Sequence, residues 1–351
     1  MHNNSATEQK DKAIAGKIIF ITGGAGFIGS ALAERLADQN RIIIFDNFKR
    51  NSIVDKPLLT AHPNVTVVTG DIRDREALRS GIDGANIVIH AAAVAGVDSV
   101  LRDPVTTMEV NVIGTYNVFT TCLEAQPHLE RVIDFSTSEV FGAYAYKVTE
   151  AKLKPELTVG EARWSYAISK LTGEFFANSF FSKYGLPIVC VRPFNIYGPG
   201  QVGEGAIHHF VVNAIQGQTL TIHSDGSQIR AWCYIDDILD ALLEILRNDR
   251  AVGHAFNIGN PKSTVTIYHL AREVIRLAGS RSGLQFKEMT SPDVEVRIPD
   301  IHKAREILGF EPQVELEDGL LRTIEWYRAK MRLQQKPAVR TTPQRGLAHV
   351  G

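Results

Sequence analysis

The chain has 351 residues, of which 44% are hydrophobic and 22% charged, and its formal net charge is −1. These values are typical of a globular protein with a full core and room for a second lobe. The balanced charge gives no reason to expect nucleic acid as a partner. No apolar run approaches the roughly 20 residues that span a bilayer, and residues 1–15 lack the apolar core of a signal peptide. We therefore expect a cytoplasmic protein without a membrane partner.

Cysteine usage and the two ends of the chain add further exclusions. Cys122, Cys190 and Cys233 are widely spaced and form no CxxC pair. Neither a zinc site nor a disulfide framework is indicated, so we expect buried thiols and no metal. The polar segments 1–15 and 331–351 are expected to be disordered tails.

The first predicted elements surround a glycine-rich turn. Ile18–Ile21 are typical of a buried strand, and an amphipathic helix is predicted over about 27–38. Three glycines lie at the turn: Gly23, Gly26 and Gly29. This spacing permits a tight turn, close approach to a pyrophosphate and packing of the helix on the sheet. The helix N-terminus then offers free N–H groups to the phosphates.

The next strand, Ile42–Phe45, ends in Asp46, where an acid can bind the adenosine ribose of NAD. The order of strand, glycines, helix, strand and acid predicts a dinucleotide site. Lys49 and Arg50 follow Asp46 and could accept the 2′-phosphate of NADP, but the Asp46 carboxylate would repel that group. The sequence therefore favours NAD.

Short apolar strands and helical segments continue to alternate along the first 200 residues, as in an α/β fold with a Rossmann-type, doubly wound parallel sheet. The further strands are Val65–Thr69, Ile87–His90, Arg131–Ser136 and Pro187–Arg192, and the longest crossover helices are predicted over 103–123 and 166–184. We assign residues 16–200 to an NAD-binding domain.

The pattern changes after residue 200. Helices are predicted over about 207–216, 238–247 and 267–279, and they mix with short strands such as Thr219–His223. Residues 201–330 are therefore expected to form mainly a smaller C-terminal α/β lobe that binds the substrate. The chain is expected to cross between the two lobes more than once.

Two segments carry candidate catalytic groups. Tyr166 and Lys170 are four residues apart and share one helix face. A lysine ammonium there can lower the pKa of the tyrosine and hold a cofactor ribose, so that the tyrosine takes a proton from a substrate hydroxyl. The hydroxyl-rich loop after residue 135 lies at the carboxyl end of a strand, where ligands bind in such sheets. That loop contributes Ser136, Thr137, Ser138 and Glu139, although serine and threonine are also ordinary turn residues.

Several motifs in series resemble the extended short-chain dehydrogenase/reductase family. They are TGGAGFIGS with the acid at 46, GDIRD (70–74), HAAA (90–93), STSEVFG, YAISK, RPFNIYGPG (192–200) and NIGN (257–260). Within that family the chain is similar to the NAD-dependent nucleotide-sugar epimerases, dehydratases and decarboxylases. A nucleotide-diphosphate sugar is the partner that this resemblance implies.

The resemblance also implies roles for matching residues. Those implied to hold NAD are Gly23, Gly26, Phe27, Ile28, Gly29, Asp46, Asn47, Asp71, Ile72, Ala91, Ala92, Ala93, Ser136, Tyr166, Lys170 and Pro193. Asn111 is grouped with them because it would support the loop beside the cofactor, although it could be a plain helix cap. The catalytic set is Tyr166, Lys170 and Thr137, with Ser138 and Glu139 beside it. The residues implied to bind the substrate are Thr137, Asn195, Arg230 and Arg297.

Members of this group share a first step, in which the sugar C4 is oxidised with bound NAD. The TSE triplet at 137–139 and Arg163-Trp164 resemble decarboxylases acting on UDP-glucuronate, whereas YAISK and YGPGQ (197–201) resemble 4-epimerases. We expect a UDP-sugar 4-epimerase first, a decarboxylase second and a 4,6-dehydratase third. A dinucleotide-binding module without catalysis is a remote alternative. The two long helices are also expected to pair two chains into a homodimer, as they often do in the family.

Overall fold

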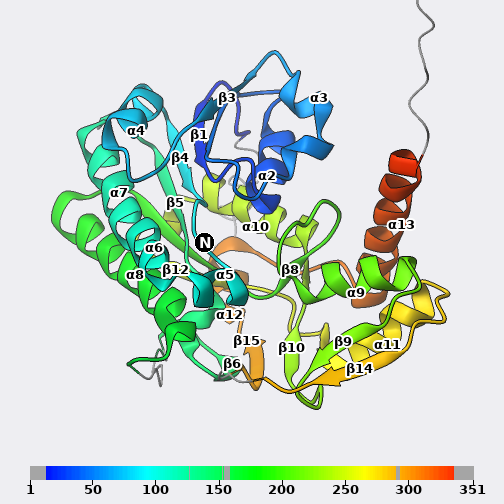
Figure 1. Cartoon of the computed structure of the whole chain (residues 1–351). Helices are drawn as coiled ribbons and strands as arrows, with labels where there is room; N and C mark the ends of the chain where they lie inside the picture. Colours follow the sequence, from blue (N-terminus) through cyan, green and yellow to red (C-terminus); the bar gives the residue numbers. More distant parts are fainter. Residues whose placement is uncertain (1–12, 126, 152, 154–158, 290–292, 336–351) are drawn as a thin grey trace, which may run out of the picture.

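The computed structural model describes residues 13–125, 127–151, 153, 159–289 and 293–335 (Figure 1). Most of the two expected tails, residues 1–12 and 336–351, lies outside the described residues. Within the described part, Ile14 packs against the core and helix α13 (Leu316–Gln335) continues past residue 330. The predicted start of the C-terminal tail, residue 331, is therefore too early. The segment KMRLQQ consists of good helix formers and extends α13 beyond that residue.

Seven parallel strands form the large sheet, in the order β12-β7-β5-β4-β1-β2-β3. They are β1 (Ile18–Thr22), β2 (Arg41–Asp46), β3 (Val65–Thr69), β4 (Ile87–His90), β5 (Arg131–Phe135), β7 (Ile188–Pro193) and β12 (Ala255–Ile258). Six of them are the predicted strands, and the Rossmann-type α/β fold is confirmed. The direction of winding reverses between β1 and β4, which places a ligand crevice at the carboxyl ends of these strands.

Helices cover both faces of this sheet (Figure 1). One face carries α4 (Arg75–Ile82), α7 (Thr115–Glu124) and α8 (Ser165–Tyr184) over a core that includes Phe20 and Phe119. The other face carries α2 (Phe27–Leu36), α10 (Ile235–Arg247) and α12 (His302–Leu308), packed on residues such as Ile19 and Ile21. Near-continuous apolar strands such as IIFIT follow from burial on both sides.

The helix predicted over 103–123 is divided. It consists of α6 (Pro104–Met108), a π-helical turn η2 (Glu109–Gly114) and α7. Such π turns are frequent near functional sites. Here the turn carries Asn111, which is buried and faces the loop after β4.

The smaller lobe is built on a four-stranded sheet in the order β13-β10-β15-β6. Its strands are β6 (Tyr144–Val148), β10 (Ile229–Ala231), β13 (Thr264–Thr266) and β15 (Val296–Pro299), and only the β10–β13 pair is antiparallel. Two-stranded pairs join β9 (Leu220–His223) to β14 (Leu284–Lys287) and β8 (Ile196–Tyr197) to β11 (Cys233–Tyr234). The lobe also contains α9 (Ala206–Ile215), α11 (Ile267–Leu277) and α13.

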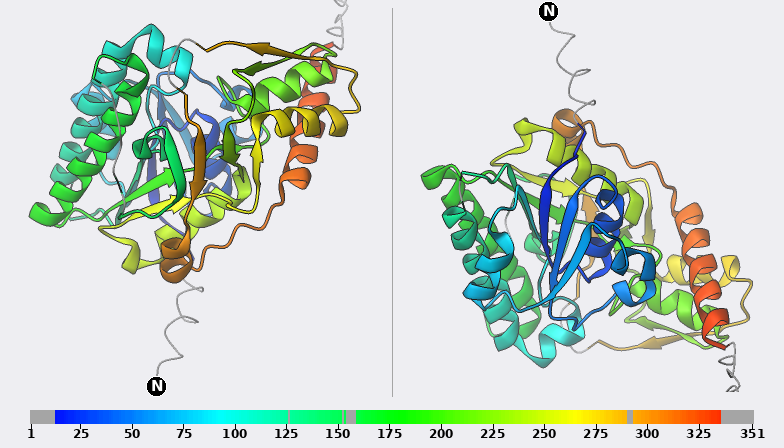
Figure 2. Two further views of the ribbon diagram at one scale, coloured as in Figure 1. Left: turned by 90° about the horizontal axis from the view of Figure 1, so that it is seen from below. Right: turned by 90° about the horizontal axis from the view of Figure 1, so that it is seen from above.

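The two lobes exchange strands, as the views in Figure 2 show. Strand β6 comes from the first half of the sequence but pairs with β15 in the small sheet. Strand β12 comes from the second half but pairs with β7 in the large sheet. A boundary at residue 200 therefore separates two halves of the sequence but does not separate the two lobes. None of the helices in the described part of the chain is long and apolar enough to cross a membrane.

Candidate active site

A cavity of about 790 Å³ lies at the carboxyl ends of the large sheet and contains most of the predicted site residues. The predicted residues that line it are Gly23, Gly26, Phe27, Ile28, Gly29, Asp46, Asn47, Asp71, Ile72, Ala91, Ala92, Ala93, Ser136, Thr137, Ser138, Glu139, Tyr166, Lys170, Pro193 and Asn195. Three predicted residues, Asn111, Arg230 and Arg297, do not line it. One concave site therefore brings the nucleotide-binding turn and the Tyr/Lys pair together.

The glycine-rich turn has the tight packing that a dinucleotide cradle requires. Gly23 has φ +69°, and a Cβ there would lie 2.5 Å from the Ala92 nitrogen. A Cβ on Gly29 would lie 2.5 Å from the carbonyl oxygen of Gly23. Neither position can hold a larger residue, so the N-terminus of α2 stays open toward the cavity, where its N–H groups can receive phosphate. These residues fit the pyrophosphate of NAD.

Asp46 and Asp71 follow β2 and β3 at the adenosine end of the cavity. Asp46 accepts hydrogen bonds from the backbone nitrogens of Ala25 (2.9 Å) and Phe48 (2.8 Å), which fixes its carboxylate beside the glycine turn. Burial raises the pKa of Asp46 although these bonds lower it. Asp71 is paired with Arg73 at 2.8 Å, and this hydrogen-bonded partner lowers its pKa. Two acids at this end fit ribose hydroxyls and an adenine amino group better than a 2′-phosphate.

Asn111 supports the cavity from behind. Its Nδ2 donates to the Val94 carbonyl and to Ser169 Oγ, both at 3.0 Å, and its Oδ1 accepts from the Val94 nitrogen at 2.8 Å. These bonds place the amide between the loop after β4 and helix α8, which is the supporting role expected of Asn111, and the side chain does not line the cavity. It holds that loop next to the helix turn that precedes Lys170.

Tyr166 and Lys170 lie on the face of α8 that lines the cavity, opposite Thr137. The Thr137 side chain is close enough to the Tyr166 phenol to act on its pKa. Lys170 is 3% exposed, and its Nζ donates to the Phe135 carbonyl at 2.6 Å. Helix α8 and the end of β5 thus place both side chains at the cavity, with the Lys170 ammonium fixed at the Phe135 carbonyl.

The pKa of Tyr166 differs from the expectation. Burial raises it to about 12, and the nearby Glu139 charge acts in the same direction, while the Thr137 side chain lowers it. The charges of the protein alone therefore do not give a phenol that ionises near neutral pH. Lys170 is not among the main influences on the pKa of Tyr166, and its ammonium donates to the Phe135 carbonyl.

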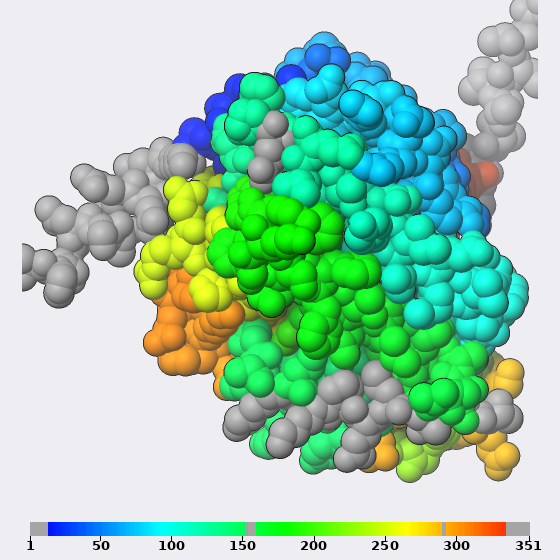
Figure 3. All heavy atoms as spheres, turned by 90° about the vertical axis from the view of Figure 1, so that its left-hand side faces the viewer, coloured from blue at the N-terminus to red at the C-terminus, as the bar shows by residue number. Residues whose placement is uncertain are grey.

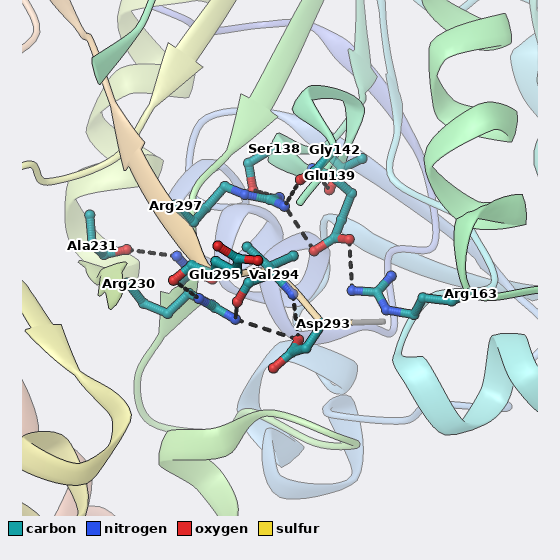
Figure 4. A network of polar contacts seen from close by, with 12 residues as sticks. Ser138, Glu139, Gly142, Arg163, Arg230, Ala231, Asp293, Val294, Glu295 and Arg297 are labelled. Carbon is teal, nitrogen blue, oxygen red and sulfur yellow. Dashed lines mark hydrogen bonds and ion pairs between the residues drawn. The ribbon is translucent and has the colours of Figure 1, made fainter. Parts of the chain in front are cut away.

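Glu139 is held between two arginines (Figure 4). Its Oε2 lies 2.8 Å from Arg163 Nη2 and its Oε1 lies 3.3 Å from Arg297 Nη1. Arg297 also donates to Ser138 Oγ at 3.2 Å and to the Gly142 carbonyl at 2.6 Å. Burial acts to raise the pKa of Glu139, but the charges of Arg297 and Arg163 outweigh it, so the pKa is lowered. Glu139 is therefore an ionised carboxylate at the cavity wall.

Arg297 and Arg230, which the resemblance implies bind the substrate, do not line the cavity. Both are buried register neighbours on β15 and β10, so their charges need separate partners. Arg297 is bonded to the 138–142 loop, as described above, and Arg230 donates to the carbonyl of Val294 and lies 3.5 Å from Asp293 (Figure 4). Neither guanidinium faces the cavity, so in this structure both hold loops. Asn195 does line the cavity, with φ +44° and its Nδ2 bonded to the Ala231 carbonyl at 2.8 Å.

Comparison with known families agrees with this geometry. The sequence model of the NAD dependent epimerase/dehydratase family matches residues 19–259, from β1 through β12. The chain belongs to this family. The match spans the glycine turn, the hydroxyl loop and the Tyr/Lys helix, and it confirms the resemblance stated from the sequence. NAD is the cofactor of this epimerase/dehydratase family member, as the donor set of the cavity requires.

Two curated relatives in the epimerase/dehydratase family are decarboxylases. The chain is 32% identical over 322 residues to a UDP-N-acetyl-alpha-D-glucosaminuronate decarboxylase of Bacillus cytotoxicus, covering 89% of this chain and 98% of the relative. It is also 32% identical over 323 residues to UDP-glucuronic acid decarboxylase 6 of Arabidopsis thaliana, covering 91% of each. Both relatives act on sugar nucleotides that carry a carboxylate.

Solved structures of the family include epimerases. The epimerase Mth375 of Methanothermobacter thermautotrophicus superposes with a TM-score of 0.86 at 29% identity, covering 94% of this chain and 98% of that one. A UDP-glucuronic acid 4-epimerase of Bacillus cereus, solved with UDP-glucuronic acid and NAD, superposes with a TM-score of 0.82 at 26% identity, covering 89% and 99%. The fold is thus shared by several reactions of this epimerase/dehydratase family.

One cluster of polar residues beside the cavity was not predicted from the sequence. Arg50 and Ser99 line the cavity, and Arg50 Nη2 lies 2.6 Å from the Ala95 carbonyl and 3.2 Å from Glu204 Oε1. Glu204 also accepts from the nitrogens of Asp98 and Ser99 at 2.8 and 3.1 Å. Gly96, with φ +92°, leaves room for this contact, since a Cβ would lie 2.6 Å from Arg50 Nη2. Gly96 is the feature of the sequence that could have indicated this cluster. The sequence alone, however, does not show which residues pack against that glycine.

Proposed function

We propose that this chain is an NAD-dependent decarboxylase of a UDP-hexuronate, such as UDP-glucuronate or its N-acetylamino counterpart. This replaces the 4-epimerase as the first expectation, because both curated relatives described above are decarboxylases. The observation in the site that carries the proposal is Glu139, an ionised carboxylate held by Arg163 and Arg297 on the same wall as Tyr166.

Different residues of the cavity have different roles in the proposed reaction. Tyr166 takes the proton of the sugar O4, with the Thr137 side chain acting to lower the pKa of the phenol, and Lys170 lines the same cavity from the next turn of α8. NAD, which the glycine-rich turn and Asp46 would hold, would supply a hydride acceptor for the sugar C4 and would be regenerated in the same cycle. The resulting C4 ketone is β to the C6 carboxylate, so the C5–C6 bond can break with its electrons moving to O4. CO₂ leaves as that bond breaks, and the enolate that remains then takes a proton at C5 to give the C4 ketone of a pentose.

Glu139 favours this outcome for an electrostatic reason. A carboxylate that two guanidiniums keep ionised repels the C6 carboxylate of the substrate, and the repulsion ends when CO₂ leaves as a neutral molecule. A 4,6-dehydratase needs an acid beside the sugar C6 as well as a base at C5, and an ionised Glu139 can act only as the base at neutral pH. Ser138, which occupies the position of the usual dehydratase acid, is bonded to Arg297.

A 4-epimerase of a UDP-hexuronate is the second candidate. The motif YAISK lacks the acidic residue that the commonest decarboxylases carry there. A UDP-glucuronic acid 4-epimerase shares the fold at a TM-score of 0.82. Both candidates take the same class of substrate and differ in the fate of the ketone.

Product analysis separates them. Purified protein incubated with UDP-glucuronate and, separately, UDP-N-acetylglucosaminuronate is expected to release CO₂ and give a UDP-pentose by NMR. UDP-glucose, which has no C6 carboxylate, serves as the matched control and is expected to give no CO₂. UDP-galacturonate from UDP-glucuronate, with no CO₂, would establish the epimerase instead. No turnover and no transient absorbance near 340 nm on any of these would contradict an enzyme of either kind.

We also propose that two copies pair through the face formed by α6, η2, α7 and α8, which lie side by side in Figure 3. Large apolar side chains are exposed on it: Val105, Ile113, Tyr116 and Phe175. A groove on the same face is lined by Pro104, Val105, Met108, Glu109, Val112, Ile113 and Ser165. A second copy would cover this apolar surface.

A further inference from the structure

Beneath Lys170 lies a buried acid that the site described above does not use. Asp134, on β5, is 2% exposed, and its Oδ1 is buried without a hydrogen-bond partner among the described residues. A Cβ built on Gly173 would lie 3.8 Å from Asp134 Oδ2, so the carboxylate packs against α8 one turn beyond Lys170. A carboxylate in such a place requires a compensating charge.

The neighbours of Asp134 in the sheet do not provide a compensating positive charge. His90 on β4 and Cys190 on β7 are its register partners. Both nitrogens of His90 are bonded to threonines, Nδ1 to Thr22 at 2.8 Å and Nε2 to Thr115 at 3.0 Å. The Cys190 thiol is buried and its pKa is raised by burial, so it stays neutral.

The charged groups on the helix side form one close pair. Glu174 on α8 is bound to Arg192 through Nε at 2.8 Å and Nη2 at 2.6 Å, so each of these charges has its partner. No ion pair within 4.0 Å joins Asp134 to another described residue, and Lys170 is the positive charge on α8 that lowers the pKa of Asp134 from a greater distance. Only one hydrogen bond of the Lys170 ammonium, to the Phe135 carbonyl, is found among the described residues, and Phe135 directly follows Asp134 in β5. An ammonium has three donors.

We propose that Asp134 is the counter-ion of Lys170, a positioning residue that keeps the ammonium charged and directed into the cavity from behind. This inference depends on the proposed function in one respect only, namely that Lys170 acts beside Tyr166 and holds the cofactor ribose. Burial lowers the pKa of Lys170, and the charge of Asp134 is the strongest of the influences that raise it. Burial likewise raises the pKa of Asp134, to about 6. In acid the carboxylate therefore takes up a proton and no longer raises the pKa of Lys170.

The test is the pH dependence of NAD affinity, measured by calorimetric titration between pH 5 and pH 10. In Asp134→Asn, the alkaline midpoint at which affinity falls is expected to lie at least about one pH unit below that of the wild type. Cys190→Ala changes the same buried layer without removing a charge and is expected to keep the wild-type midpoint. Coincident curves for Asp134→Asn and the wild type would overturn the proposal. Because NAD binding is the readout, the result does not depend on which sugar is turned over or on whether the proposed reaction occurs.

A double-mutant cycle on melting temperature covers the case in which Asp134→Asn alone is unstable. Lys170→Met leaves the Asp134 carboxylate without a counter-ion and is expected to lower the melting temperature. Adding Asp134→Asn to Lys170→Met is expected to restore part of that loss. Simple additivity of the two changes would contradict a charge pair, since a merely structural Asp134 would cost the same in either background.

Discussion

The guanidinium of Arg50 and the carboxylate of Glu204 meet across the mouth of the cavity, 3.2 Å apart, although they are 154 residues apart in the sequence. Arg50 belongs to the loop after β2, and Glu204 to the segment between β8 and α9. This contact joins the two lobes beside the cavity that Arg50 lines.

Glu204→Gln is expected to increase the dissociation rate of NAD about tenfold, because charge-assisted hydrogen bonds contribute about 1.5–3 kcal/mol each. The rate is measured by chasing bound NADH, followed by its fluorescence, with excess NAD. Asp240→Asn is the control, since the Arg35–Asp240 pair (2.6 Å) is exposed and remote from the cavity. Equal dissociation rates in Glu204→Gln and the wild type would contradict the prediction.

Tyr166→Phe removes the proposed base while keeping the ring. Proton transfer contributes roughly 10²–10⁴-fold to rate, so kcat is expected to fall by this range while NAD affinity stays close to the wild type. Steady-state rates and NAD titration on the same preparation check both parts. A kcat within threefold of the wild type would show that another group takes the proton.

Glu139→Gln tests the choice between the two candidate reactions. CO₂ release is expected to fall by about 10²–10³-fold, as when one preorganised electrostatic group is removed. Two buried guanidiniums also lose their common partner, which is expected to lower the free energy of unfolding by about 3–5 kcal/mol. Ser138→Ala, which removes one bond to Arg297 and no charge, is the control for loop disturbance. Undiminished turnover without CO₂ release would identify an epimerase.

Acid is expected to destabilise the fold through His90. Burial lowers its pKa to about 3 from an ordinary value of 6.5, with Lys170 acting in the same direction. The unfolded chain therefore binds a proton that the folded chain excludes, so stability is complete above pH 6.5 and is lost as the pH falls toward 3. His90 alone accounts for about 2 kcal/mol between pH 7 and pH 5.

Urea unfolding at these two pH values measures the effect. In His90→Gln this part of the pH dependence is expected to disappear. His208→Gln serves as the comparison variant. Because burial also lowers the pKa of His208, to about 4, this variant is expected to lose a separate part of the pH dependence and to keep the part that His90 contributes. If the difference between pH 7 and pH 5 in His90→Gln matched the wild type, His90 would not be the group that titrates.

The proposed pairing of two chains predicts a monomer on charge insertion. Phe175 is 66% exposed in the middle of the α8 face, and Phe175→Asp would place a charge in a desolvated interface. Sedimentation velocity at micromolar concentration is expected to change from dimer to monomer. Phe286→Asp, at an exposed aromatic residue of β14 in the other lobe, is the matched control and should keep the wild-type mass. A wild-type monomer would rule out the pairing at the outset.

Local patterns predicted the parts of this protein that depend on local physics. Strands buried on both faces, such as Ile87–His90, appear in the sequence as continuous apolar runs, and the glycine spacing at Gly23 and Gly29 reflects contacts within one turn. The positions of Tyr166 and Lys170 follow from the period of one helix.

Features that depend on distant segments could not be predicted in the same way. Arg230 was given to the substrate because an arginine suits a diphosphate, but residues 293–295 satisfy its guanidinium instead. Nothing near Arg230 in the sequence indicates those partners. The same holds for Arg50 and Glu204, and for Asp134, whose neighbours in space come from β4, β7 and α8.

The exchange of β6 and β12 between the lobes has a consequence for how this protein can change. Each sheet receives an outer strand from the opposite half of the gene, so a break at residue 200 would remove an edge from both. The halves are thus expected to melt in one cooperative transition and to resist recombination with other sugar-recognising modules through a single crossover. New substrate preferences must instead come from point changes around a shared scaffold.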